Sequence, residues 1–138
     1  MVPVKPPVVT SDLNRFFWQA GAQGKLQIQR CQACQFYLHP PGAICPRCHS
    51  ADLLPEAVSG QATLYTYSVI KRAFHPAFTE DLPYAVAIVE LVEQNALRVV
   101  TRIVDCPEQS LDIGMKLQVK FVQQDDVWLP MFSPCVTE

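Results

Sequence analysis

The sequence predicts a mainly β protein built from an N-terminal helix, a four-cysteine metal module and a small five-stranded barrel. Three observations support this prediction: an apolar stripe at helical spacing around residue 16, two Cys-x-x-Cys pairs between residues 31 and 48, and five β-rich runs after residue 60. The chain has 138 residues, of which 49% are hydrophobic and 17% are charged. That length suits one compact domain with a small appendage.

Residues 1–25 are expected to form an extended arm followed by an amphipathic helix, because prolines restrict the backbone of the first ten residues. The apolar stripe repeats at i, i+3, i+4 and i+7 and consists of Leu13, Phe16, Phe17 and Ala20. The candidate helix caps and stops are Thr10, Ser11, Asp12, Gly21 and Gly24. Trp18 falls outside the stripe, so we expect it to pack on another element or on another protein.

Residues 26–55 are expected to form the metal module. A strand begins at Leu26, and the module then places Cys31-x-x-Cys34 ten residues before Cys45-x-x-Cys48. Each Cys-x-x-Cys pair can direct two thiolates at one ion, and two pairs complete a tetrahedron, the usual geometry of structural zinc. Four sulfur ligands leave no open position for water or substrate. We therefore expect one zinc ion with a structural role.

The cysteine pattern also admits interpretations other than zinc. Iron fits the same four thiolates, and Cys45-x-x-Cys48-His49 matches the c-type haem attachment pattern, which leaves the first pair unexplained. A redox pair needs an exposed thiol of low pKa, and two matched pairs favour a metal. His39 and His49 are surplus to a complete ligand set and are expected at the surface. Cys106 and Cys135 lie outside the module, without an evident base.

Residues 56–138 are expected to form the barrel. Five runs rich in β-branched and aromatic residues favour strands over helices, and they cover residues 62–70, 84–92, 97–104, 115–122 and 127–132. The connection at residues 93–96 is short enough for a hairpin. The longer loop at residues 72–83, which contains Phe74, His75 and Phe78, is where a barrel would carry function.

The charge distribution argues against a nucleic-acid clamp and a membrane span. Net charge is −2; residues 1–72 carry seven Lys/Arg and three Asp/Glu, whereas residues 73–138 carry four and ten. An acidic barrel half lacks the positive field that non-specific nucleic-acid binding needs. No run approaches the roughly 20 apolar residues of a membrane helix, and the first residues lack the apolar core of a signal peptide. We expect a cytoplasmic protein.

In its order of motifs the chain resembles a family of prokaryotic proteins that join an N-terminal helix, a rubredoxin-like zinc ribbon and a C-terminal OB-fold, formerly classed as a domain of unknown function. The matching segments are Phe16-Phe17-Trp18, Gly24-Lys25-Leu26, Arg30-Cys31-x-x-Cys34, Pro40-Pro41, Cys45-Pro46-Arg47-Cys48, Gly60, Leu82-Pro83-Tyr84, Ile113-Gly114-Met115 and Leu129-Pro130-x-Phe132. The family often has glycine after the second and fourth cysteines, where this chain has Gln35 and His49.

The resemblance implies an accessory subunit rather than an independent enzyme. Such proteins are associated with thiolases, hydroxymethylglutaryl-CoA synthase and lipid-transfer-protein-like aldolases, which form or cleave carbon–carbon bonds on coenzyme A thioesters. The chain would stabilise a thiolase-like or lipid-transfer-protein-like catalytic subunit and help form its substrate channel. We accordingly expect a hetero-oligomer, with no catalytic residue in this chain.

Residues for the shared surface can be nominated from their chemistry. Coenzyme A presents phosphates and an adenine ring, which call for a few cations beside an apolar surface; the candidates are Arg30, Arg47, Lys71 and Arg72. Arg30 and Arg47 could equally balance the negative charge of a four-thiolate zinc site. The candidates for the partner interface are Phe16, Trp18, Phe74 and Phe78.

Two rival functions follow from other features. A single-stranded nucleic-acid module would use exposed aromatics such as Tyr65 and Tyr67 as stacking platforms, although the acidic barrel half opposes it. A free-standing acyl-CoA hydrolase would turn over a thioester as an isolated chain. His75 could serve as an acid or base, but the sequence offers it no second catalytic group.

Overall fold

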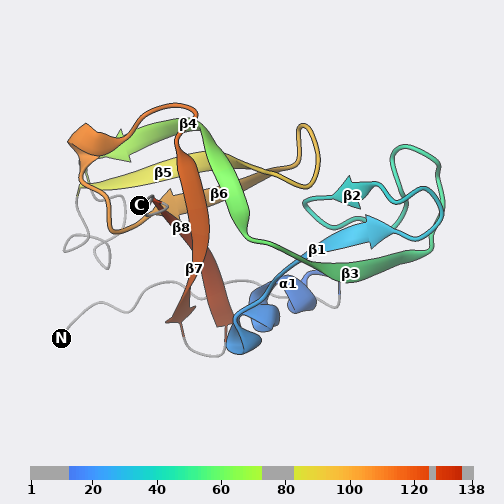
Figure 1. Cartoon of the computed structure of the whole chain (residues 1–138). Helices are drawn as coiled ribbons and strands as arrows, with labels where there is room; N and C mark the ends of the chain where they lie inside the picture. Colours follow the sequence, from blue (N-terminus) through green and yellow to red (C-terminus); the bar gives the residue numbers. More distant parts are fainter. Residues whose placement is uncertain (1–12, 73–82, 125–126, 135–138) are drawn as a thin grey trace.

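A computed structural model describes residues 13–72, 83–124 and 127–134 of the chain. They form a closed barrel and a separate three-stranded sheet, with one short helix beneath the junction of the two (Figure 1). The elements in chain order are α1 (Arg15–Gln19), η1 (Ala20–Gln23), β1 (Leu26–Cys31), β2 (Tyr37–Leu38), β3 (Leu53–Val58), β4 (Gln61–Ile70), β5 (Tyr84–Leu91), β6 (Arg98–Ile103), η3 (Glu108–Ser110), β7 (Lys116–Gln124) and β8 (Val127–Pro134).

The barrel confirms the predicted five strands, closed in the order β4-β5-β6-β8-β7. β5 alternates between buried and partly buried residues along its whole length, as a strand with one face in a core must. All neighbours pair antiparallel except β6 and β8, which are parallel and share the single register pair Ile103↔Phe132. This is the shortest strand pairing in the barrel wall. Thr101 reinforces it, since its hydroxyl donates to the carbonyl of Pro130 (2.9 Å).

The three-stranded sheet, called the ribbon below, has the order β2-β1-β3 with both pairings antiparallel. It carries the predicted cysteines at the end of β1 and in the two loops beyond it. The side chains of Leu26 and Ile28 on β1 are fully buried and join the same hydrophobic cluster as the barrel core. The ribbon and the barrel therefore share one core at their junction.

A second link joins the ribbon to the barrel through one amide side chain. The Oε1 atom of Gln94, in the β5–β6 hairpin, accepts from the backbone N–H of Tyr37 (2.9 Å), while its Nε2 donates to the carbonyl of Tyr37 (3.1 Å). The amide thus pairs with β2 as a neighbouring strand would. We call this pair of hydrogen bonds the Gln94 clasp.

The helix is shorter than the apolar stripe predicts. It begins at Arg15 after Asn14, which makes no side-chain capping bond, and a 3₁₀ turn continues it to Gln23. The predicted caps at residues 10–12 lie outside the described residues. Gly24 ends the segment with a φ of 72°, as predicted, whereas Leu13 is wrongly assigned to the buried face, being 46% exposed.

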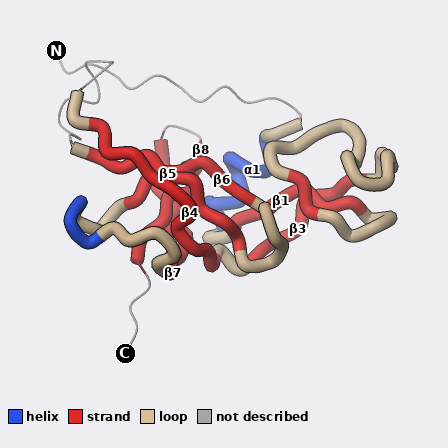
Figure 2. Tube along the Cα trace, turned by 90° about the horizontal axis from the view of Figure 1, so that it is seen from above, coloured by secondary structure: helices blue, strands red, loops and turns tan. Residues whose placement is uncertain are grey.

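Helix and 3₁₀ turn lie against the barrel near the β6–β8 pairing (Figure 2). Phe17 and Ala20 are buried there, and Phe16 and Trp18 pack on the edge of the core. Gly21 allows the close approach, because a Cβ atom at that position would lie 2.5 Å from Cβ of Trp128 and 2.7 Å from the ring of Phe121. Among the described helices, none is long and apolar enough to cross a membrane.

Candidate metal centre and partner surface

The four predicted cysteines converge on one point. Their sulfur atoms all lie within 4.8 Å of one another, with Cys31 to Cys48 at 3.5 Å and Cys34 to Cys45 at 3.6 Å. Zinc–sulfur bonds of about 2.3 Å in a tetrahedron place sulfurs about 3.8 Å apart. The cluster therefore has the size and donor set of a four-thiolate zinc site, and it leaves no position for a substrate.

Backbone N–H groups support the sulfurs in two matching turns. Cys34 N–H points at the sulfur of Cys31 (3.5 Å), and Arg47 N–H points at that of Cys45 (3.4 Å). The hydrogen bond from the Cys34 backbone is the main cause that lowers the pKa of the Cys31 thiol to about 6. These donors favour the thiolate form, which is the form that binds metal.

Gln35 and His49 close the two turns in left-handed conformations, with φ of 67° and 65°. Their N–H groups each donate 2.9 Å bonds back to the carbonyls of Cys31 and Cys45. These are the two positions at which the resembled family often has glycine, and a side chain there strains the backbone. The two turns thus share one left-handed geometry although neither residue is glycine.

Arg30 is engaged by the ribbon itself. Its Nε donates to the carbonyl of Gln35 (2.9 Å), its Nη1 pairs with Glu56 (3.0 Å), and its guanidinium lies 4.4 Å from the ring centre of Tyr37. The Glu56 hydrogen bond is the main cause that raises the pKa of Arg30, and the same bond lowers the pKa of Glu56. Arg30 thus ties the first cysteine turn to β3.

The other proposed coenzyme A contacts lie in two places. Arg47 is exposed in the second cysteine turn, with its guanidinium 6.0 Å from the ring centre of Phe36. Lys71 and Arg72 are exposed just beyond the end of β4, at the barrel end away from the ribbon (Figure 1). The four cations therefore do not converge on a single site, and their coenzyme A role stays a prediction.

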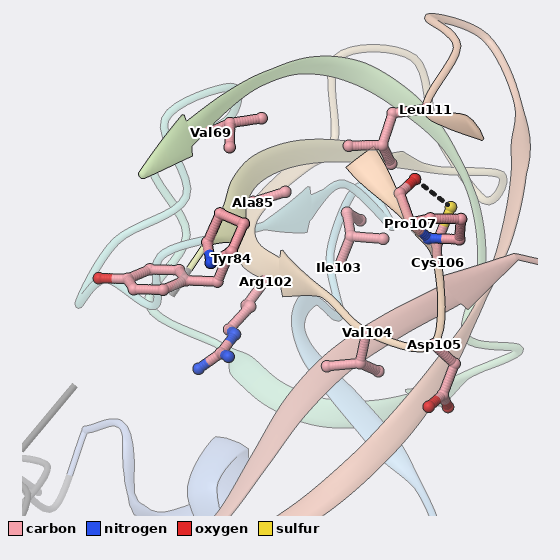
Figure 3. A pocket seen from close by; sticks show the side chains of 11 residues that line it. Val69, Tyr84, Ala85, Arg102, Ile103, Val104, Asp105, Cys106, Pro107 and Leu111 are labelled. Atoms are coloured by element: carbon pink, nitrogen blue, oxygen red, sulfur yellow. Dashed lines mark hydrogen bonds between the residues drawn. The ribbon is translucent and has the colours of Figure 1, made fainter. Parts of the chain in front are cut away.

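A cavity of 410 Å³ lies at that same end of the barrel (Figure 3). Val69 and Leu111 lie on its apolar wall, and the guanidinium of Arg102 lies 4.5 Å from the ring centre of Tyr84. Cys106 also lines it, and burial raises the pKa of this thiol, so it is a poor nucleophile. The cavity has an apolar wall, and its charged lining residues are Arg102 and Asp105.

The helix carries the predicted partner residues that the structure describes. Phe16 and Trp18 are partly buried, and the Trp18 ring meets Phe17 edge-on at 4.9 Å between ring centres. Phe74 and Phe78 lie outside the described residues. Trp18 therefore packs on its own chain and also lines a surface hollow.

That hollow, called the helix groove below, runs between α1, the loop after β2 and β6. It comprises two neighbouring hollows of 290 and 160 Å³, both lined by Phe17, Trp18 and Val100. Val100 is 70% exposed. Nε1 of Trp18 and Nδ1 of His39 are buried at this groove and have no hydrogen-bond partner among the described residues.

His39 differs from its expected surface position. It is partly buried, its ring stacks on Phe17 at 4.9 Å, and burial lowers its pKa to about 4. One feature of the sequence could have indicated this burial, the Pro40-Pro41 pair, which lies with α1 at the helix groove. Gln94 had no such signal, because a glutamine in a hairpin is ordinarily a solvated residue.

Comparisons with known proteins agree with this geometry. The model of the ChsH2 rubredoxin-like zinc ribbon domain matches residues 18–53, and that of the ChsH2 C-terminal OB-fold domain matches residues 55–122. A chain in the solved structure described as "Ltp2-ChsH2(DUF35) aldolase" is 37% identical and superposes with a TM-score of 0.82, covering 96% of this chain and 100% of that one.

Two curated relatives extend the comparison. A "probable enoyl-CoA hydratase alpha subunit" from Thermomonospora curvata is 38% identical over 96% of this chain. A "DUF35 domain-containing scaffold protein" from Methanocaldococcus jannaschii is 37% identical over 67% of this chain. The alignments span 40% and 64% of the lengths of these two relatives. By its two domains and their order, this chain belongs to the ChsH2-type DUF35 family of proteins that join a zinc ribbon to an OB-fold.

Proposed function

We propose that the chain is a non-catalytic accessory subunit of a heteromeric acyl-CoA enzyme of the thiolase or aldolase type. The observation that carries the proposal is the likeness to the DUF35 chain of a two-component aldolase over nearly the full length of both chains. The enzyme would cleave or form a carbon–carbon bond on a coenzyme A thioester in a degradative pathway. The relative named as a subunit of a probable enoyl-CoA hydratase supports the same substrate class.

The chemistry of the described residues supports a structural role. The thiolate cluster can hold zinc with four protein ligands, and such a site braces a fold rather than activating water. His39 stacks on Phe17, and its Nδ1 has no orienting partner within the described part of the chain, unlike the base of a catalytic pair. The reacting groups would then belong to the catalytic subunit.

The helix side of the molecule is the surface we assign to that subunit. Phe16 and Trp18 lie on a short helix that packs tightly on the barrel. Phe74 and Phe78, the other two interface residues proposed from the sequence, lie outside the described part of the chain. Rigid aromatic side chains lose little conformational entropy on binding and are favoured at interfaces. Through this surface the chain would order its partner and form one wall of the substrate channel.

For the thioester we favour the far end of the barrel over the ribbon. Lys71 and Arg72 follow Val69, which lines the 410 Å³ cavity, so cations and an apolar hollow occur together there. Arg30 already uses two of its donors within the ribbon. Substituting Lys71→Ala and Arg72→Ala together should raise the KM for the thioester in the assembled enzyme, while Arg47→Ala should leave it unchanged.

Native mass spectrometry of the chain coexpressed with the enzyme encoded beside it tests the main proposal. We expect a hetero-oligomer, weakened by Trp18→Ala and unaffected by Tyr65→Ala, a matched aromatic on β4 that is 46% exposed. Thermal unfolding of each free variant separates loss of binding from loss of fold. Turnover of a coenzyme A thioester by the isolated chain would refute the accessory role, and so would failure to assemble with a thiolase-like or lipid-transfer-protein-like subunit.

A further inference from the structure

The four cysteines of the metal centre differ in how far the fold covers them. Cys31 and Cys45 are fully buried in a small apolar cluster, and Cys34 lies partly buried at the edge of that cluster. Cys48 is exposed, and so is the whole stretch 46–49 in which it lies. One ligand residue is therefore accessible to small solutes, while the other three are covered by the ribbon.

The exposed cysteine has a buried cysteine beside it. The sulfur of Cys48 lies 3.5 Å from that of Cys31, and the sulfurs of Cys34 and Cys45 form the other close pair at 3.6 Å. Each close pair joins the first cysteine turn to the second. Because a disulfide bond is about 2.0 Å long, the sulfurs of Cys31 and Cys48 need to approach by about 1.5 Å to form one.

Metal ligation makes the exposed sulfur reactive. A cysteine bound to a metal ion is held in the thiolate form, which is the nucleophilic form of the side chain. Accessible thiolates with a second cysteine beside them are the usual targets of reversible oxidation. We propose that Cys48 is an oxidation site for small peroxides, and that its oxidation ends in a Cys31–Cys48 disulfide that dismantles the metal centre.

The oxidation takes two steps. In the first, the Cys48 thiolate bonds to one oxygen of hydrogen peroxide, the O–O bond breaks, and Cys48 becomes a sulfenic acid as a hydroxide ion leaves. In the second, the Cys31 thiolate bonds to the Cys48 sulfur, the S–O bond breaks, and a second hydroxide ion leaves. Two protons from solvent convert both hydroxide ions to water. The two sulfurs together lose the two electrons that the peroxide gains.

The disulfide removes two of the four sulfur ligands. The remaining thiolates, on Cys34 and Cys45, cannot complete a tetrahedral zinc site, so zinc is released. The cysteine turns then lose their brace, while Leu26 and Ile28 keep β1 on the core that the ribbon shares with the barrel. A thiol reductant breaks the disulfide by exchange and restores the ligands. The ribbon is thus a reversible oxidant-sensitive element.

Zinc release and disulfide mapping on the free, zinc-loaded full-length chain test the proposal. Hydrogen peroxide should release the bound zinc, which a chromogenic chelator detects, and a thiol reductant with added zinc should restore binding. Trypsin cleaves after Arg30 and Arg47, so it separates Cys48 from the other cysteines of the metal centre. The expected disulfide therefore joins two tryptic peptides, and tandem mass spectrometry should assign its other half to Cys31.

Two histidine variants separate exposure from ligation. Cys48→His and Cys34→His each leave three cysteines and one histidine, a donor set that also binds structural zinc. Cys48→His should keep its zinc at a peroxide concentration that empties the wild type, whereas Cys34→His should lose zinc as the wild type does. Cys106→Ser combined with Cys135→Ser removes the thiols outside the metal centre and should leave the release rate unchanged.

Three results would overturn this inference. They are a peptide map of the oxidised wild type without a Cys31–Cys48 bond, equally fast zinc release from Cys48→His and the wild type, and slower release when Cys106 and Cys135 are replaced. If Cys48→His binds no zinc, the peptide map of the wild type decides. Because every measurement uses the free subunit, these outcomes are independent of whether the proposed enzyme complex forms.

Discussion

Gly21 offers a sharp test of how the helix is held on the barrel. Alanine at this position would place Cβ 2.5 Å from Cβ of Trp128 and 2.7 Å from Cδ1 of Phe121, where carbon atoms normally stay about 3.5 to 4.0 Å apart. The Trp128 atom lies next to its backbone, so a side-chain rotation cannot relieve the overlap. The 3₁₀ turn must therefore move by about 1 Å, which typically costs about 1 to 3 kcal/mol in a packed core.

Two other glycines separate steric overlap from backbone strain. Gly42→Ala meets nothing closer than the carbonyl of Ile44 at 3.9 Å, so its stability should stay within about 0.5 kcal/mol of the wild type. Gly24→Ala has free space but a φ of 72°, and should lose about 1 kcal/mol through strain alone.

Urea unfolding followed by circular dichroism measures all three variants. With a slope of about 1 to 3 kcal/mol per molar urea, Gly21→Ala should lower the midpoint by roughly 1 M, more than Gly24→Ala does. The same displacement should weaken assembly with the catalytic subunit, because Phe16 and Trp18 move with the turn. A Gly21→Ala midpoint equal to that of Gly42→Ala would refute the close packing of the turn on β7 and β8.

Three further predictions concern the ribbon and its junction with the barrel. Burial lowers the pKa of His39 from 6.5 to about 4, so between pH 6.5 and pH 4 the unfolded chain binds a proton at this residue more readily than the folded chain does. The free energy of unfolding should therefore fall by about 3 kcal/mol as the pH drops from 6.5 to 4. His39→Phe should remove this pH dependence, whereas His49→Ala should keep it. Gln35→Gly and His49→Gly relieve positive φ values of 67° and 65° and should each raise stability by about 0.5 to 1 kcal/mol; a lower thermal midpoint for both would contradict the strain argument. Cys45→Ser, or chelation of the zinc-loaded chain, should abolish one-to-one zinc binding and increase backbone hydrogen exchange in the two cysteine turns. Leu26 and Ile28 should keep β1 on the core that the ribbon shares with the barrel. Hydrogen exchange that rises equally throughout the barrel would contradict the view that the metal stabilises the ribbon alone.

The barrel strands were predictable because their runs are rich in β-branched and aromatic residues, which favour strands over helices. The runs at residues 62–70 and 84–92 agree with β4 and β5 to within one residue at each end. The cysteines were predictable for a different reason. Their spacing is dictated by the geometry of one ion, whatever the surrounding fold.

The features that escaped prediction depend on contacts distant in sequence. The stripe that includes Leu13 predicts a longer helix, but the chain turns to a 3₁₀ conformation after Gln19 so that Gly21 can approach β7 and β8. Burial of His39 arises from its stack on Phe17, 22 residues earlier in the sequence. Periodicity within a segment carries no information on either contact.

The Gln94 clasp restricts the length of the β5–β6 hairpin. Both hydrogen bonds to Tyr37 need the amide at one fixed height above β2, so a residue inserted or deleted between Leu91 and Gln94 would turn the side chain away while leaving the barrel intact. The ribbon would then rest on its apolar contacts and on the hydrogen bonds that Ser59 and Gly60 make with the barrel, and its orientation would loosen. Epitope tags and fluorescent reporters should therefore be placed elsewhere than in this hairpin. If a change in the length of the hairpin leaves the function of the protein intact, the ribbon and the barrel do not need a fixed mutual angle for that function.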